Sequence, residues 1–128
     1  RDDVESRGLG DVYKRQDRLG SAYRLSEKYG VTVLAKSADT FAVDGGKVYL
    51  CTEGTTTLAK GGSGDMLAGI VSSYVAQGCD ALDAAALGSF TLGSTALLAG
   101  YKRSERGIIA RDVIDALPRF LYDLENAD

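Results

Sequence analysis

Residues 57–71 read TLAKGGSGDMLAGIV, a glycine-rich turn followed directly by a carboxylate and an apolar run. A chain that enters a helix through such a turn leaves several backbone N–H groups unpaired and pointing the same way. Together with the positive end of the helix dipole, these donors form an anion site. Glycine suits it because a side chain would hold a phosphate away from the backbone. The pattern predicts a phosphate cradle made by Gly62, Ser63 and Gly64, with the Ser63 hydroxyl as an added donor.

Asp65 follows the cradle directly. A carboxylate there repels a bound phosphate unless it interacts with an atom other than the phosphate. One interpretation makes Asp65 a general base that accepts a hydroxyl proton while the cradle stabilises the transferring phosphoryl group. The structural alternative is that aspartate is favoured in the first turn of any helix and that the glycines only make a turn. Spacing alone leaves both open.

Two familiar phosphate motifs are excluded. A Walker A loop ends in Gly-Lys-Ser/Thr, but here Gly64 is followed by Asp65 and Met66. A dinucleotide G-x-G-x-x-G fails because Leu67 stands where its third glycine belongs. The turn belongs to another class of phosphate site.

The composition restricts the remaining chemistry. The chain has 128 residues, 45% hydrophobic and 26% charged, with a net charge of −3 and no basic stripe, so we expect no nucleic-acid partner. It has no histidine, which excludes His-based triads and His–metal sites within it, and we expect no protein-bound metal centre. Its two cysteines are expected to be free thiols. We see no apolar run near the roughly 20 residues of a membrane span and no signal peptide, and therefore expect a cytoplasmic protein with no membrane partner.

The elements around the turn begin after a leader. Residues 1–16, RDDVESRGLGDVYKRQ, are highly charged and aperiodic, and their tail resembles an adapter-derived stretch, so we expect an extraneous or disordered leader. The domain is expected over 17–128. It opens with a helix from Asp17 to a cap at Gly30. The helical face predicted to be apolar holds Leu19, Ala22, Tyr23, Leu25 and Ser26.

The rest of the pattern is a strand, a hairpin and three helical stretches. Residues 31–35 read as a buried strand, and two alternating runs flank the turn Asp44-Gly45-Gly46. A helix is expected over 63–77, with Leu67, Ile70, Val71, Tyr74 and Val75 on its apolar face. A second, small-residue helix should run from a cap at Asp80 to about Ala99. A third stretch, 111–124, should be broken by Pro118. This order predicts an α/β layer arrangement whose sheet is incomplete.

Four stretches together resemble the NAD(P)H-hydrate dehydratases of the ribokinase-like superfamily. The first is AKGGSGDMLAGIVSSYVAQG (59–78), similar to the glycine–aspartate motif of the superfamily. The others are YGVTVLAKSADTFAVDGGKVYL (29–50), ALDAAALG (81–88) and RGIIARDVIDALP (106–118). The resemblance covers about 17–124 and implies a ribokinase-like layered α/β fold, of which this chain would be the C-terminal half.

The resemblance also implies a chemistry and its residues. In that family the terminal phosphoryl group of ADP or ATP activates the hydroxyl of hydrated NADH or NADPH, and elimination then restores the reduced cofactor. We expect ADP as the co-substrate, with Mg²⁺. Gly64 would contact the phosphates and Asp65 would face the hydrate. The residues expected to line the nucleotide are Lys36, Ser37, Ala38, Asp39 and Thr40.

The sequence departs from the family pattern at Ser37, which stands in place of glycine, and at Leu92, where the family commonly carries histidine. Two other functions stay open: a hydroxyl kinase of the same superfamily, which shares the Gly-x-Gly-Asp turn, and a nucleotide-binding module without turnover. A homo-oligomer packed through residues 82–99 is a further hypothesis.

Overall fold

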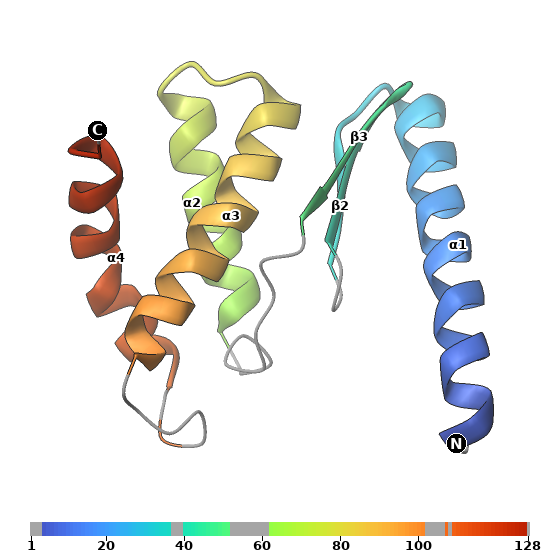
Figure 1. Cartoon of the computed structure of the whole chain (residues 1–128). Helices are drawn as coiled ribbons and strands as arrows, with labels where there is room; N and C mark the ends of the chain where they lie inside the picture. Colours follow the sequence, from blue (N-terminus) through green and yellow to red (C-terminus); the bar gives the residue numbers. More distant parts are fainter. Residues whose placement is uncertain (1–3, 37–39, 52–61, 102–106, 108, 128) are drawn as a thin grey trace.

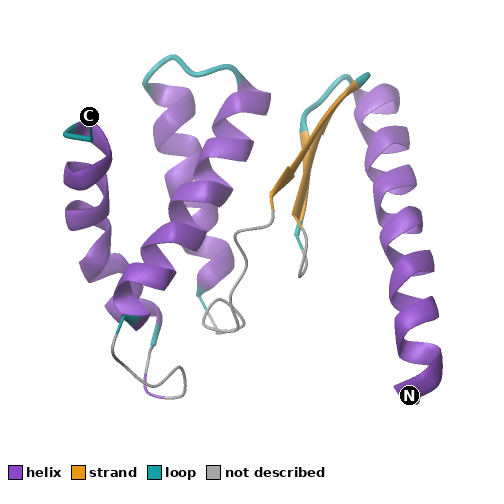
Figure 2. Ribbon diagram, in the orientation of Figure 1, coloured by secondary structure: helices purple, strands orange, loops and turns teal. Residues whose placement is uncertain are grey.

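The computed structural model describes residues 4–36, 40–51, 62–101, 107 and 109–127, and for 4–16 it describes only the backbone. Helix α1 lies on one face of the sheet, α3 lies on the other, and α2 and α4 pack on α3 (Figures 1 and 2). This arrangement confirms the predicted α/β class and the order of helix, strand, hairpin and helices. The elements are α1 (Val4–Tyr29), β1 (Val33–Ala35), β2 (Thr40–Asp44), β3 (Lys47–Cys51), α2 (Ser63–Ala76), α3 (Ala81–Gly100) and α4 (Ala110–Glu125).

The described sheet is antiparallel, with β2 between β1 and β3. Alternate residues of β2 are buried on opposite faces: Phe41 and Val43 pack against α1, and Ala42 packs against α3. The predicted hairpin turn is confirmed, with Gly45 at φ 56. Its N–H donates to the buried Ser26 hydroxyl of α1 at 2.8 Å. The first helix therefore holds both one face of the sheet and the hairpin turn.

Helix α1 begins at Val4, earlier than the expected Asp17, and ends at the predicted left-handed glycine, Gly30 (φ 63). Its backbone runs as helix through 4–16, so this segment is not separated from the rest by a break in secondary structure. Ala22 is buried on the sheet, but Leu25 is 47% exposed, contrary to the prediction. Leu25 lies three residues beyond Ala22, at the outer edge of the apolar stripe.

Helices α2 and α3 pack closely. A Cβ built on Gly88 would lie 2.5 Å from Cγ2 of Val71, so only glycine fits at this crossing. A small residue at this position of α3 therefore lets α2 approach closely. The predicted cap is also confirmed, because the Asp80 carboxylate accepts the N–H of Leu82 at 3.2 Å.

The apolar character of α3 corrects one expectation. Within its 20 residues, an 18-residue window has a mean hydropathy of 1.3, enough by length and composition alone to cross a bilayer. Half of this window is buried, and α3 contacts β2, β3, α2 and α4. A helix at the centre of a protein core has the same length and composition, so this is weak evidence for a membrane span.

Helix α4 runs unbroken through Pro118, and the predicted interruption is wrong. Proline has no N–H for the carbonyl of Ile114, four residues earlier. Both residues are exposed, so water can satisfy that carbonyl. The inner face, with Val113 buried in the same cluster as Leu92 of α3, keeps the helix in place.

Candidate functional site

The glycine turn forms the N-terminus of α2, as the sequence predicts. Gly62 is the N-cap, at φ 91 in the left-handed region that favours glycine. The first backbone bond of the helix runs from the N–H of Met66 to the Gly62 carbonyl at 3.0 Å. The N–H groups of Ser63, Gly64 and Asp65 therefore precede the helical ladder, and among the described residues no side chain caps them. They make a cluster of donors at the positive end of the helix dipole.

Lys36 brings a cation to this cluster. It follows β1, and a Cβ built on Gly64 would lie 3.0 Å from the Lys36 Nζ. Any side chain at Gly64 would therefore press on the ammonium group. Among the described residues Lys36 makes no ion pair, so its charge is not neutralised by Asp65. The structure thus places a lysine ammonium and backbone donors together, an arrangement that can hold a phosphate.

Asp65 differs from an ordinary helix cap, as a comparison with α4 shows. Both helices carry aspartate at the third position, Asp65 in α2 and Asp112 in α4. Asp112 bonds back to the N–H of its N-cap residue, Ile109, at 2.9 Å. Asp65 is exposed and makes no hydrogen bond with the part of the chain that the structure describes. Among the described residues its carboxylate is not used for capping, and its place in the first turn of α2 fits the structural interpretation as well.

The start of α4 is a neighbour that the sequence reading did not place. A Cβ built on Gly62 would lie 3.5 Å from Cβ of Ala110, so the N-termini of α2 and α4 adjoin. The sequence predicts a helical stretch over 111–124, but nothing in its spacing predicts this contact with the glycine turn. The cradle therefore lies where the end of β1 and the starts of two helices meet.

Of the other residues predicted to line the nucleotide, one lies in the described part of the chain and three do not. Thr40 opens β2, at the same end of the sheet as Lys36, because Ala35 pairs with Phe41. Its side chain is half-buried. Ser37, Ala38 and Asp39 lie outside the described residues.

Cys51 is a half-buried thiol at the end of β3, where it pairs with Thr40 across the sheet. Burial raises the pKa of Cys51, and the neighbouring Ser89 hydroxyl lowers it by less. The thiol is therefore held protonated at neutral pH, which agrees with a passive role for this cysteine.

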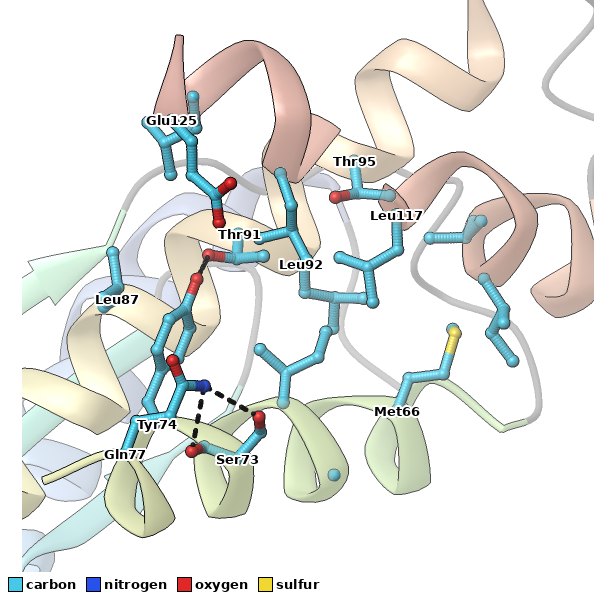
Figure 3. A pocket seen from close by; sticks show the side chains of 16 residues that line it. Met66, Ser73, Tyr74, Gln77, Leu87, Thr91, Leu92, Thr95, Leu117 and Glu125 are labelled. Atoms are coloured by element: carbon cyan, nitrogen blue, oxygen red, sulfur yellow. Dashed lines mark hydrogen bonds between the residues drawn. The ribbon is translucent and has the colours of Figure 1, made fainter. Parts of the chain in front are cut away.

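The structure also contains a pocket that the sequence patterns did not predict. It is a pocket of about 490 Å³ between α2, α3 and α4, lined mainly by apolar side chains (Figure 3). Its lining begins at Met66, in the first turn of α2, and reaches Gln77 and Glu125 at the ends of α2 and α4. Periodicity predicts which faces are apolar but not that two helices on α3 stand far enough apart to leave a cavity.

Comparison with known proteins gives one family. The family profile described as NAD(P)H-hydrate dehydratase matches residues 3–119. This range includes most of the segment that the sequence analysis set apart as a leader, and the boundary before Asp17 stays a prediction.

Three curated relatives show the same likeness. The bifunctional NAD(P)H-hydrate repair enzyme Nnr of Vibrio cholerae is 36% identical over 106 residues, which are 83% of this chain and 22% of that enzyme. The ADP-dependent (S)-NAD(P)H-hydrate dehydratase of Haloterrigena turkmenica is 36% identical over 104 residues, 80% of this chain and 40% of that protein. The corresponding protein of Natrialba magadii is 34% identical over 111 residues, 86% of this chain and 41% of that protein. The chain thus spans between about a fifth and two fifths of these relatives.

Proposed function

Because the chain belongs to the NAD(P)H-hydrate dehydratase family, we propose that the protein carrying it dehydrates hydrated NADH or NADPH at the expense of ADP. The observation that carries the proposal is the position of the Lys36 Nζ against Gly64, at a helix N-terminus whose aspartate is not used as a cap. Two curated relatives are named as ADP-dependent, which favours ADP over ATP.

The proposed mechanism assigns separate tasks to the cradle and the carboxylate. The terminal phosphates lie on the N–H groups of Ser63 and Gly64, and Lys36 offsets their charge. Asp65 accepts the proton of the hydrate's hydroxyl group while the oxygen of that hydroxyl forms a bond to the terminal phosphorus of the nucleotide. The bond between this phosphorus and the rest of the nucleotide breaks at the same time. The hydroxyl becomes a phosphate ester. Inorganic phosphate then leaves with the C–O electron pair, and loss of a proton from the neighbouring ring carbon restores the double bond.

We propose that a divalent ion binds at this site only together with the nucleotide. The described residues contain no group of three side chains able to ligate a metal. Mg²⁺ is commonly held by one or two carboxylates together with substrate phosphates. Mg²⁺ would therefore be held mainly by the phosphates of the bound nucleotide and would neutralise their charge, which leaves Asp65 available as the general base.

The test uses the protein encoded by the complete gene, supplied with hydrated NADH and ADP or ATP. We expect NADH absorbance to return only when nucleotide is present. Asp65→Asn should lower the rate about 10²- to 10⁴-fold, the usual contribution of a general base, while nucleotide affinity is kept. The matched control is Asp115→Asn, an exposed aspartate of α4, which should leave the rate unchanged.

Two outcomes would favour other functions. Nucleotide binding without return of NADH, together with phosphorylation of an added alcohol, would make the protein a hydroxyl kinase. Nucleotide binding with neither reaction would make it a binding module without turnover. Equal rates for Asp65→Asn and the unmodified protein would remove Asp65 from the chemistry.

A further inference from the structure

The pocket between α2, α3 and α4 has the size and lining of a small-molecule site. Its volume of about 490 Å³ lies within the usual range for ligand pockets, and its walls are mostly leucine, isoleucine, valine and methionine side chains. Helix α3 forms its floor, and α2 and α4 form its sides (Figure 3). The proposed nucleotide chemistry lies on the turn before Met66 and uses no residue of this lining.

The floor of the pocket carries a polar group without a partner. Thr95 is 1% exposed, and its Oγ1 has no hydrogen-bond partner in the part of the chain that the structure describes. A buried hydroxyl left unpaired costs free energy, so such groups are uncommon without a reason. The neighbouring hydroxyl, that of Thr91, is satisfied by the Tyr74 hydroxyl at 2.8 Å. Thr95 thus offers a bonding position to whatever fills the pocket.

One end of the pocket favours positive charge. Glu125 lines it and directs its carboxylate toward the side where Tyr74 and Thr91 lie (Figure 3). Glu125 makes no ion pair with any residue in the described part of the chain. Helices α2 and α4 both end here, and neither has a basic residue in its last turn. The negative ends of two helix dipoles therefore add to the Glu125 charge.

We propose that this pocket binds a small, mainly apolar molecule with a cationic end, whose ammonium group lies at Glu125 and whose polar atom bonds to Thr95. The cation would neutralise the negative charge of the carboxylate and of the two helix ends. The apolar body would pack against the pocket walls, and the hydrogen bond would give the unpaired hydroxyl a partner. This site is separate from the proposed nucleotide site and does not depend on it.

The test compares two probes of equal length and opposite charge, 4-(4-hydroxyphenyl)butylamine and 4-(4-hydroxyphenyl)butyrate, in which the phenol hydroxyl supplies the polar atom for Thr95. Met66 lines the pocket and is the only methionine among the 128 residues, so a ¹³C-labelled methionine methyl reports on it directly. Met66→Leu identifies its resonance. We expect the amine to shift this resonance saturably and to bind more tightly than the acid.

Two substitutions separate the parts of the proposal. Glu125→Gln should weaken the amine about two- to fivefold, the effect of an exposed charge pair, and so reduce the preference over the acid. Glu27→Gln, an exposed glutamate of α1, is the matched control and should change nothing. Thr95→Val should weaken the amine about fivefold through the lost hydrogen bond, yet raise the urea midpoint of the empty protein by removing an unpaired hydroxyl.

Three results would overturn the proposal. A Met66 resonance unaffected by the amine would mean that the pocket does not bind such molecules. Equal binding of acid and amine, unchanged in Glu125→Gln, would remove the charge preference. A shift of the Met66 resonance with protein concentration, blocking the probe, would show that a second copy of the chain fills the pocket instead.

Discussion

Gly64 leaves the first turn of α2 open to a ligand, and the Lys36 ammonium lies against it. The two residues come from distant points of the sequence, one at the end of a strand and one at the start of a helix. A phosphate that reaches the backbone N–H groups would therefore also reach the ammonium group. Replacing the hydrogen of Gly64 by a methyl group should affect both contacts without disturbing the fold, because the atom that it meets is the flexible end of a lysine.

We predict that Gly64→Ala weakens nucleotide binding about tenfold or more, as expected for losing a hydrogen bond to a charged group, and causes no loss of stability. Calorimetric titration with ADP and urea unfolding measure the two effects. Gly69→Ala is the matched control in the same helix, where a Cβ meets nothing within 4 Å. It should raise the free energy of unfolding by about 0.5–1 kcal/mol and leave ADP binding unchanged. Unchanged ADP affinity in Gly64→Ala would place the phosphates elsewhere.

At the scale of elements, local signals identified most helices and strands. Gly30, the turn at Gly45 and the cap at Asp80 all act as predicted, because each depends on the conformation or hydrogen bonding of a few neighbouring residues. Pro118 failed as a helix breaker because packing of α4 on α3 outweighs one missing hydrogen bond on the exposed side. Which elements touch could not be predicted, since the contact of Gly62 with Ala110 and the pocket depend on distances between helices.

The crossing of α2 and α3 gives an element-scale prediction. Gly88→Ala places its methyl group 2.5 Å from Cγ2 of Val71 and should lower the free energy of unfolding by about 1–3 kcal/mol, the usual cost of overpacking. Val71→Ala removes Cγ2 and leaves its own Cβ 3.5 Å from the new one, an ordinary contact. The double variant should therefore be more stable than Gly88→Ala alone, with a coupling of about 1 kcal/mol or more in urea unfolding. Simple additivity of the two changes would show that the helices do not cross at these residues.

At the scale of the whole molecule, α3 joins two parts: the sheet with α1, and the pair α2 and α4. The cradle lies where these parts meet, since Lys36 comes from the sheet side and Gly64 from the helical side. Anion binding should therefore depend on how firmly both parts pack on α3. The glycine turn predicts the Gly64 half of this site, but Lys36 is assigned to it only through the resemblance, because residues 28 positions apart carry no local sign of being neighbours.

The first sixteen residues give the whole-molecule prediction. The described contacts of α1 with the sheet come from Leu19, Ala22, Tyr23 and Ser26, all beyond this segment. If residues 1–16 lie outside the domain, as the sequence predicts, deleting them should change the free energy of unfolding by no more than about 0.5 kcal/mol and leave ADP affinity unchanged. As a reference, Ala22→Asp buries a charge at a position 2% exposed and should unfold the protein or cost several kcal/mol, as urea titration followed by circular dichroism would show. If the deletion approached the cost of Ala22→Asp, residues 1–16 would belong to the fold, and the domain boundary at Asp17 would be wrong.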